Sequence, residues 1–72
     1  MAEFKFLGYL TDIVGARTKK VKLEKPVPLR EMVPSTLPET NVIILINQKV
    51  GHLDSLIRNE DTVTIMPILS GG

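Results

Sequence analysis

The run VIILI, residues 42–46, is a continuous series of large apolar side chains in a chain of 72 residues. A strand in which every side chain is apolar is typical of one that is buried on both faces of a sheet. A chain of this size buries only about 60% of its unfolded surface. Because it has no cysteine, no disulfide can supplement the core. The run therefore predicts the central strand of one small domain that hydrophobic packing must stabilise.

Two segments near the ends of the chain alternate between apolar and polar residues, as strands with one buried face do. In Glu3–Leu10 (EFKFLGYL), Phe4 and Phe6 alternate with charged residues, and in 62–66 (TVTIM) Val63 and Ile65 alternate with threonine. The stretch 18–25 (TKKVKLEK) repeats the pattern. Gly15, between the first two segments, suits a turn or the end of a helix. These segments predict an N-terminal hairpin and a last strand that ends at Pro67.

One helix is predicted between these strands. Leu29, Met32 and Val33 have the i, i+3, i+4 spacing of one helix face. Pro28 suits the first turn of a helix, and Pro34 disfavours helical geometry in the residue before it. The helix is therefore expected to be short, about two turns.

The predicted order of elements is β-β-α-β-(β)-β. A small mixed sheet of four to five strands with one short helix packed on one face accommodates this order. The first and last strands would then lie side by side at the centre, which is the β-grasp arrangement of the α+β class. We expect a β-grasp domain over residues 1–67 and a flexible Gly-Gly tail over residues 68–72.

Composition excludes several functions. The net charge of +1 gives no broad electrostatic surface for nucleic acid, and the aromatic residues are too few for base stacking. No apolar run reaches the roughly 20 residues of a membrane helix, and the first residues lack the basic start of a signal peptide. His52, the only histidine, cannot build a metal site without several carboxylates, and with Asp54 and Ser55 it forms no catalytic triad pattern. We expect a cytoplasmic protein with no catalytic residues and no metal or cofactor of its own.

Basic residues cluster in one part of the sequence: Arg17, Lys19, Lys20, Lys22 and Lys25. One interpretation is a solvated strand face, because lysines are usually exposed. The other is a docking patch for an acidic partner. The sequence leaves both interpretations open.

The last six residues of the sequence, 67–72, read PILSGG. Five extended residues after Pro67 would reach about 17 Å, far enough to enter a pocket of another protein. Gly71 and Gly72 have no Cβ, so they can pass through a narrow channel. A terminal carboxylate is ionised at neutral pH and is a poor electrophile, so it needs activation, typically as a mixed anhydride with AMP from ATP. Glycines at a chain end also occur by chance, and the pair alone is a weak signal.

Two stretches resemble the sulfur-carrier family of the small subunit of molybdopterin synthase (MoaD) and of the thiamine sulfur carriers (ThiS). FLGYLTDIVGARTKKVKL resembles the opening of the family, where Leu10 and Gly15 match an "L-x-x-x-x-G" pattern. INQKVGHLDSLIRNEDTVTIMPILSGG resembles its closing half, with Asn47 in a "V-N-G" turn and Asp61 in a "G-D-x-V" turn. The ending PILSGG resembles "P-P-V-S-G-G". The opening favours the molybdopterin branch.

The resemblance implies a ubiquitin-like fold and a defined chemistry at the C-terminus. Gly72 would be adenylated by an E1-like enzyme that uses ATP, and a sulfur donor such as a cysteine desulfurase or a rhodanese-like protein would then supply a thiocarboxylate. The large subunit of molybdopterin synthase would receive the tail in molybdenum cofactor biosynthesis. Gly71 would thread the channels of these partners. The remaining tail residues would dock in their grooves: Ser70, Leu69, Ile68 and Pro67.

The chain also departs from the family pattern. Glu60 and Gln48 stand where glycine is usual, Ile68 replaces the second proline of the tail, and Pro34 shortens the helix. The alternatives are a sulfur carrier for thiamine or tRNA thiolation, and a ubiquitin-like modifier conjugated through Gly72. A further alternative is an interaction module that binds through the sheet around Lys20 and Lys22.

Overall fold

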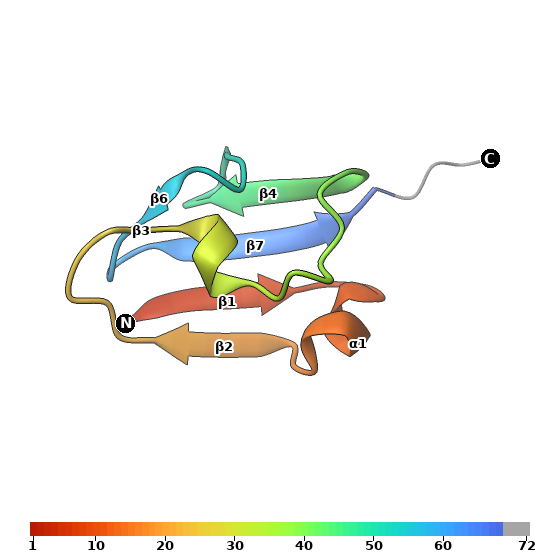
Figure 1. Ribbon diagram of the computed structural model, residues 1–72, viewed down its shortest axis with the longest axis horizontal. Coiled ribbons are helices and arrows are strands. Elements are labelled where there is room, and N and C mark those ends of the chain that lie inside the picture. The colour runs from red at the N-terminus through yellow and green to blue at the C-terminus, as the bar shows by residue number, and fades with distance from the viewer. Residues whose placement is uncertain (69–72) are drawn as a thin grey trace.

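The computed structural model describes residues 1–68 and contains one five-stranded sheet and one two-stranded sheet (Figure 1). In chain order the elements are β1 (Ala2–Phe6), α1 (Leu10–Val14), β2 (Thr18–Val21), β3 (Val27–Pro28), the 3₁₀ helix η1 (Leu29–Met32), β4 (Val42–Ile46), β5 (Lys49–Val50), β6 (Leu56–Ile57) and β7 (Thr62–Pro67). The larger sheet has the order β2-β1-β7-β4-β5. β3 and β6 form the smaller one.

The first and last strands lie side by side at the centre of the larger sheet, as predicted. β1 pairs in parallel with β7, with Phe4 opposite Val63 and Phe6 opposite Ile65. These four side chains are at most 2% exposed and lie on the same face of the sheet. The alternation in the sequence therefore identified both central strands and their buried face.

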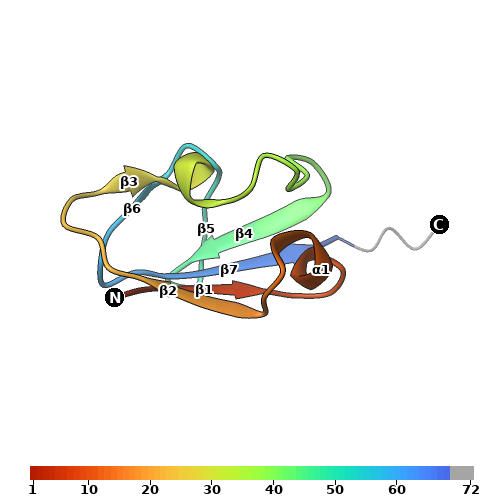
Figure 2. The same ribbon diagram turned by 60° about the horizontal axis from the view of Figure 1, so that its bottom comes forward.

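One layer covers that buried face, and the other face of the sheet is open. Figure 2 shows β3, β6 and η1 on one side of the larger sheet. The covering layer contributes buried side chains to a core shared with the sheet. The buried hydrophobic residues are Ala2, Phe4, Phe6, Leu10, Leu29, Leu37, Ile44, Leu53, Ile57, Val63 and Ile65.

β4 has the bounds predicted from the apolar run, but the prediction that both of its faces are buried is wrong. Ile44 is buried, whereas Ile43 on the opposite face is 36% exposed. No element of the described chain covers that face, because the chain has only enough residues to build one layer beside the sheet (Figure 2). The apolar residues of β4 that do not face the core therefore lie at the surface.

The predicted helix at Leu29–Val33 is a 3₁₀ helix that ends at Met32. Leu29 is fully buried, so the predicted helix face does point into the core. Val33 has extended backbone angles (φ −118°, ψ 154°), as expected for a residue that precedes proline. Pro34 therefore stops the helix before an α-helical turn is complete.

The α-helix of the structure, α1, lies where the sequence indicated a turn. It buries Leu10, and the Oγ1 of Thr11 donates a hydrogen bond to the carbonyl oxygen of Phe6. Gly15 ends it with φ +86°, and its N–H donates to the carbonyl oxygen of Thr11 at 2.8 Å. Gly15 thus has the helix-terminating role that the sequence allowed. A single helical turn is too short for hydrophobic periodicity to reveal.

Candidate functional site

The C-terminal segment singled out by the sequence begins at the end of β7. Pro67 pairs with Val42, and the N–H of Ile68 donates to the carbonyl oxygen of Asn41 at 2.8 Å. The root of the segment therefore lies beside β4, at the end of the most central strand (Figure 1). The other predicted site residues lie outside the described residues, and their roles stay predictions: Leu69, Ser70, Gly71 and Gly72.

Pro67 is held in place by a close approach of the loop that follows β1. The N–H of Leu7 donates to the carbonyl oxygen of Ile65, so the pairing of β1 with β7 continues past Phe6. Gly8 follows with φ +58°, and a Cβ on this residue would lie 2.9 Å from Cγ of Pro67. Both the positive φ and the contact require glycine here. The backbone of Gly8 thus packs against the root of the segment.

Apolar side chains surround this root on the open face of the sheet. Met66 pairs with Ile43 of β4, and the continued pairing of β1 with β7 brings Leu7 alongside Met66 on its other side. These positions share a face, since each is offset by one residue from a buried neighbour. Leu7 is 45% exposed, and Ile68, two residues beyond Met66, is 47% exposed. We call these residues the exit patch: Leu7, Ile43, Met66 and Ile68.

The sequence indicates the exit patch by apolar residues at positions where alternation predicts polar ones. In an alternating strand beside an open face, the positions between buried residues are normally polar. Lys5 and Thr64 follow this rule, whereas Leu7 and Met66 break it at the ends of the same strands. On β1, its continuation and β7, the apolar exceptions therefore lie next to the tail root.

The opposite end of β7 is polar and fixed by a buried carboxylate. Asp61 is 9% exposed, and its two carboxylate oxygens accept hydrogen bonds from Nδ2 of Asn47 at 2.8 Å and from the backbone N–H of Arg58 at 2.7 Å. Oδ1 of Asn47 in turn accepts from the N–H of Thr62 at 3.0 Å. The turn between β4 and β5 is therefore tied to the start of β7. The sequence placed Asn47 and Asp61 in separate turns and did not reveal this contact.

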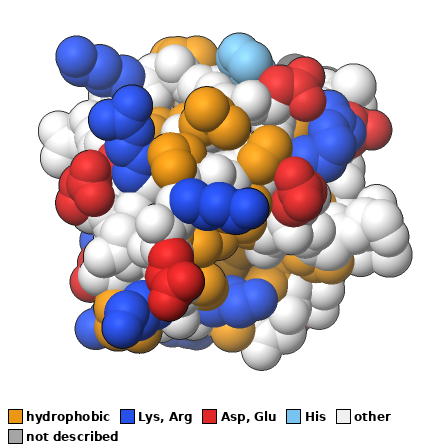
Figure 3. Space-filling view, turned by 60° about the vertical axis from the view of Figure 1, so that its left-hand side comes forward, with side chains coloured by type: hydrophobic (Ala, Val, Ile, Leu, Met, Phe, Trp, Pro, Cys, Tyr) orange, Lys and Arg blue, Asp and Glu red, His pale blue; other side chains and the backbone are white. Residues whose placement is uncertain are grey.

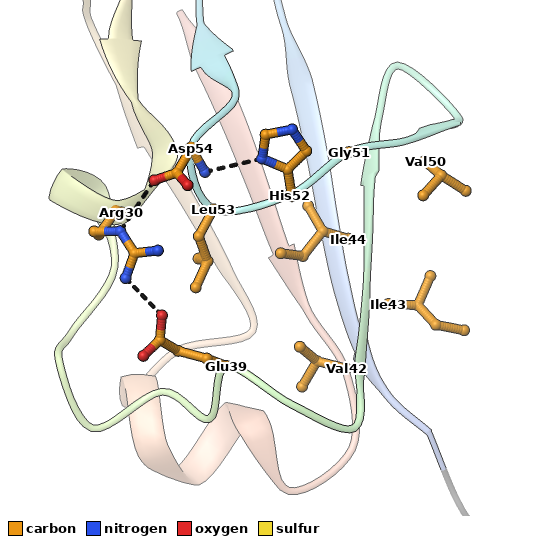
Figure 4. A pocket seen from close by; sticks show the side chains of 10 residues that line it. All are labelled: Arg30, Glu39, Val42, Ile43, Ile44, Val50, Gly51, His52, Leu53 and Asp54. Carbon is orange, nitrogen blue, oxygen red and sulfur yellow. Dashed lines mark hydrogen bonds and ion pairs between the residues drawn. The ribbon is translucent and has the colours of Figure 1, made fainter.

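A groove with a volume of about 450 Å³ lies between β4 and the loop 51–54 (Figure 4). Nη1 of Arg30 lies 2.6 Å from Oε1 of Glu39, and Nε of Arg30 lies 3.2 Å from Oδ1 of Asp54. The hydrogen bonds that Arg30 donates to Glu39 and, second, to Asp54 raise the pKa of Arg30 above its ordinary value. Both carboxylates are paired with the same cation. These pairs therefore join η1 to the loops that contain Glu39 and Asp54.

His52 and its neighbours support no catalytic arrangement. Nδ1 of His52 accepts from the N–H of Asp54 at 3.2 Å, and Oγ of Ser55 accepts from the N–H of His52 at 3.1 Å. All three side chains thus stabilise the local turn or the pair with Arg30. Within residues 1–68, no group of histidine and carboxylate side chains is arranged to hold a metal ion. Nor does the described chain contain a helix long and apolar enough to cross a membrane.

Charges of both signs lie close together on one face of the molecule. On the face shown in Figure 3, Lys and Arg side chains alternate with Asp and Glu around small groups of hydrophobic side chains. The basic residues singled out by the sequence lie on β2 and on the loops at its two ends, and all are exposed. In the strand order, β1 and β7 lie between this basic cluster and β4, and β1 alone lies between the cluster and β7.

No protein-family model and no curated protein sequence matches this chain. Its fold, in contrast, matches solved structures over almost the whole length of both chains. SAMP1 from Haloferax volcanii matches with a TM-score of 0.74 and 17% identity, over 99% of this chain and 98% of the other. A Pyrococcus furiosus protein assigned as molybdopterin converting factor, subunit 1, matches with a TM-score of 0.68 and 14% identity, over 94% and 97%.

A further structure, of H. volcanii small archaeal modifier protein 1, has a TM-score of 0.72 at 14% identity, over 94% of this chain and 97% of that one. At these identities the likeness concerns the fold. The mixed sheet with β1 and β7 at its centre and one covering layer is the β-grasp arrangement, and the chain has the ubiquitin-like fold that these small proteins share.

Proposed function

We propose that this chain, with Gly72 as its carboxyl terminus, is a carrier protein whose terminal carboxylate is activated by an E1-like adenylating enzyme in the cytoplasm. The observation that carries the proposal is the exit patch, an exposed apolar surface around the root of the segment that ends in Gly-Gly. A carrier that delivers its terminus into another protein's pocket needs a docking surface next to that terminus. Leu7, Ile43 and Ile68 supply such a surface at the end of a rigid central strand.

Two further observations support the proposal. The fold matches small proteins that include a modifier and a protein assigned as a molybdopterin converting factor subunit. The sequence, independently, resembles the sulfur carriers at the ending PILSGG and at the turns that contain Asn47 and Asp61. The close contact between these two turns gives that resemblance a physical basis, because both turn sequences contribute to one hydrogen-bonded unit.

The chemistry follows from the functional groups available. The carboxylate of Gly72 attacks the α-phosphorus of ATP, which releases pyrophosphate and forms an acyl adenylate. The terminal sulfur of a persulfide on a donor protein, such as a cysteine desulfurase or a rhodanese-like protein, attacks the acyl carbon and displaces AMP. A thiol then attacks the donor's sulfur in the acyl disulfide, which releases the thiocarboxylate and leaves a disulfide on the donor. The carrier contributes no cysteine to any step.

The sequence favours the precursor of molybdopterin as the acceptor of the sulfur. The carrier would then be the small subunit of a molybdopterin synthase. Its tail, residues 67–72, would then enter the large subunit, with Gly71 in the narrowest part of the channel and Ser70, Leu69, Ile68 and Pro67 in the docking groove. Thiamine or tRNA thiolation would use the same carrier chemistry.

The direct test is activation of the terminus. Incubation with ATP, the cognate activating enzyme and a persulfide donor is expected to replace one oxygen of Gly72 by sulfur. Mass spectrometry of the C-terminal peptide would detect the corresponding gain in mass. A chain that lacks only Gly72 is the matched control and should not be modified. If the intact chain is never adenylated by its cognate enzyme, the proposed function is wrong.

The docking role of the exit patch has its own test. Ile43→Asp places a charge in the patch and is expected to raise KM for the carrier in the activation assay about tenfold, since a charge in an apolar contact costs more than about 1 kcal/mol. Leu56→Asp is the matched control, because Leu56 is also exposed but lies in β6 outside the patch. Equal effects of the two substitutions would exclude the patch as the docking surface.

The second candidate is a ubiquitin-like modifier, in which a lysine amine displaces AMP or a thiol from the activated Gly72. The fold match to a small archaeal modifier protein supports this role as the second candidate. Recovery of covalent conjugates, each heavier than its target by one carrier chain, would identify this role. Loss of these conjugates on deletion of Gly72 would separate them from tight non-covalent complexes.

A further inference from the structure

β2 is an edge strand with one free side. Within residues 1–68 it pairs only with β1, and in the strand order nothing lies beyond it (Figure 1). The other edge of the sheet is formed by β5, which has two residues and therefore offers little backbone to a neighbour. β2, with four residues, is the longer of the two free edges.

The register identifies which backbone groups of β2 point outward. The N–H of Phe6 donates to the carbonyl oxygen of Arg17, so these two residues form a hydrogen-bonded pair. In an antiparallel ladder such pairs alternate with pairs that exchange no hydrogen bonds. Phe4 and Lys19 are therefore bonded to each other, whereas Thr18 and Lys20 direct their N–H and C=O groups away from β1. Two donors and two acceptors thus line the free edge.

The same edge carries most of the positive charge of the molecule. Segment 17–25 contains five basic residues and one acidic residue, a net charge of +4. The rest of the chain contains four basic and seven acidic residues, a net charge of −3, although the whole chain has a net charge of only +1. The pair between Nζ of Lys20 and Oε1 of Glu3, at 3.9 Å and exposed, neutralises little of this charge. The charge is therefore separated by region, with the cations gathered on one strand edge.

We propose that the free edge of β2 binds an extended acidic segment of a partner protein, which adds a strand to the sheet. The outward N–H and C=O groups of Thr18 and Lys20 would pair with the backbone of that segment, as in β-strand addition. Its carboxylates would lie beside the basic side chains on both faces, since Lys19 and Lys20 point to opposite sides of the sheet. The proposal concerns a surface separate from the exit patch and does not depend on Gly72.

The charge pattern favours this occupant over two others. Lysines along an edge repel the identical edge of a second copy, so the arrangement opposes self-association. A nucleic acid would be drawn to the same cations, but it would not use the outward backbone groups. The acidic remainder of the molecule would also repel its phosphates. A peptide strand with carboxylates satisfies both the charges and the backbone.

The test uses a synthetic acidic peptide with acids on both faces of an extended strand, acetyl-EDVTEDVT-amide, titrated into the full-length chain labelled with ¹⁵N. Chemical-shift changes are expected in residues 17–22, together with slower hydrogen exchange at the amides of Thr18 and Lys20. The dissociation constant should rise with salt, since exposed charges are screened. A peptide with glutamine and asparagine in place of the acids, acetyl-QNVTQNVT-amide, is expected to bind much more weakly. Deletion of Gly72 should leave binding unchanged.

A pair of substitutions separates charge from backbone. Lys20→Gln removes the charge and is expected to weaken binding about two- to threefold. Lys20→Pro removes the charge and the outward N–H, which β1 does not use, and is expected to weaken binding about tenfold. Lys49→Gln, an exposed lysine on the other edge strand, should have no effect.

Several outcomes would overturn the proposal. Shift changes confined to β4 and β5, equal affinities for Lys20→Gln and Lys20→Pro, or equal binding of the neutral peptide would each do so. Stronger binding of an oligothymidylate than of the acidic peptide would assign the cations to nucleic acid, and sedimentation of the free chain as a dimer would assign the edge to a second copy. The hydrogen-exchange result for the unaltered chain decides the question even if Lys20→Pro fails to fold.

Discussion

The two ends of β7 differ in what surrounds them, although they belong to one strand. At its start, the buried carboxylate of Asp61 joins the turn at Asn47 to the backbone of Arg58 through short hydrogen bonds. At its end, Pro67 pairs with Val42 and its ring lies against Gly8, and the neighbouring side chains of the open face are apolar and partly exposed. One end is thus fixed by hydrogen bonds to a buried carboxylate, and the other presents apolar groups to solvent.

This difference suggests a division between stability and function along a single strand. A buried, fully paired carboxylate fixes the register of the strand, because a shift of one residue would break several hydrogen bonds at once. An exposed apolar patch contributes little to the stability of the isolated chain and is typical of a surface that binds a partner.

The comparison predicts its largest effect at Asp61. Asp61→Ala removes the charged acceptor of two short, partly buried hydrogen bonds, from Nδ2 of Asn47 and from the N–H of Arg58, so we expect the free energy of unfolding to fall by about 2–4 kcal/mol. Urea denaturation followed by circular dichroism would measure it. Glu60→Ala, the neighbouring exposed carboxylate, is the control and should change stability by less than about 0.5 kcal/mol. Similar losses in the two variants would mean that Asp61 does not fix the start of β7.

The next largest effect is expected at the other end, from Gly8→Ala. The added Cβ meets Cγ of Pro67 at 2.9 Å, and the positive φ adds strain, so together they should cost about 2 kcal/mol. Gly15→Ala is the matched control: its φ is also positive, but no atom lies within 4 Å of the added Cβ, so we expect a loss of about 1 kcal/mol. Equal losses would show that the contact with Pro67 has no energetic role.

These two glycines illustrate how far the sequence predicts the fold. Alternation located the buried faces of β1 and β7, because every second residue in those strands has the polarity that its environment requires. It did not locate α1, because one helical turn shows no periodicity, and it gave no reason for Gly8, whose constraint is a contact with a residue 59 positions away. Local patterns predict the elements, but contacts between distant turns need the folded chain.

The candidate site was predictable to a similar degree. The resemblance directed attention to Pro67 and Ile68, and the structure adds that Leu7 and Ile43 lie on the same face beside them. Ile43 was expected to be buried, because an all-apolar strand does not reveal which of its faces remains open. The missing information was the number of layers in the fold, which no single strand contains.

The turn that follows β4 predicts a gain in stability. Asn47 and Gln48 both have positive φ, 53° and 70°, in a two-residue hairpin turn of the kind in which glycine is usual at the second position. Gln48→Gly should therefore raise the free energy of unfolding by about 1 kcal/mol, because it removes backbone strain. Lys49→Gly, one residue later in β5, should instead lower it. A loss of stability in Gln48→Gly would show that the side chain of Gln48 makes a compensating contact.

The smallest effect on stability is expected within the exit patch, and it completes the comparison. Ile43→Thr keeps the β-branched shape on a partly exposed position, so the free energy of unfolding should fall by about 0.5 kcal/mol or less. The same substitution at Ile44, which is 6% exposed on the opposite face, places a hydroxyl group in the core and should cost about 2 kcal/mol. The activation assay should be run at a temperature at which both variants are folded. There Ile43→Thr should have the larger effect and raise KM several-fold, whereas Ile44→Thr should leave KM unchanged. If Ile43→Thr lowered stability as much as Ile44→Thr, the open face would be part of the core, and the end of β7 would not differ from its start.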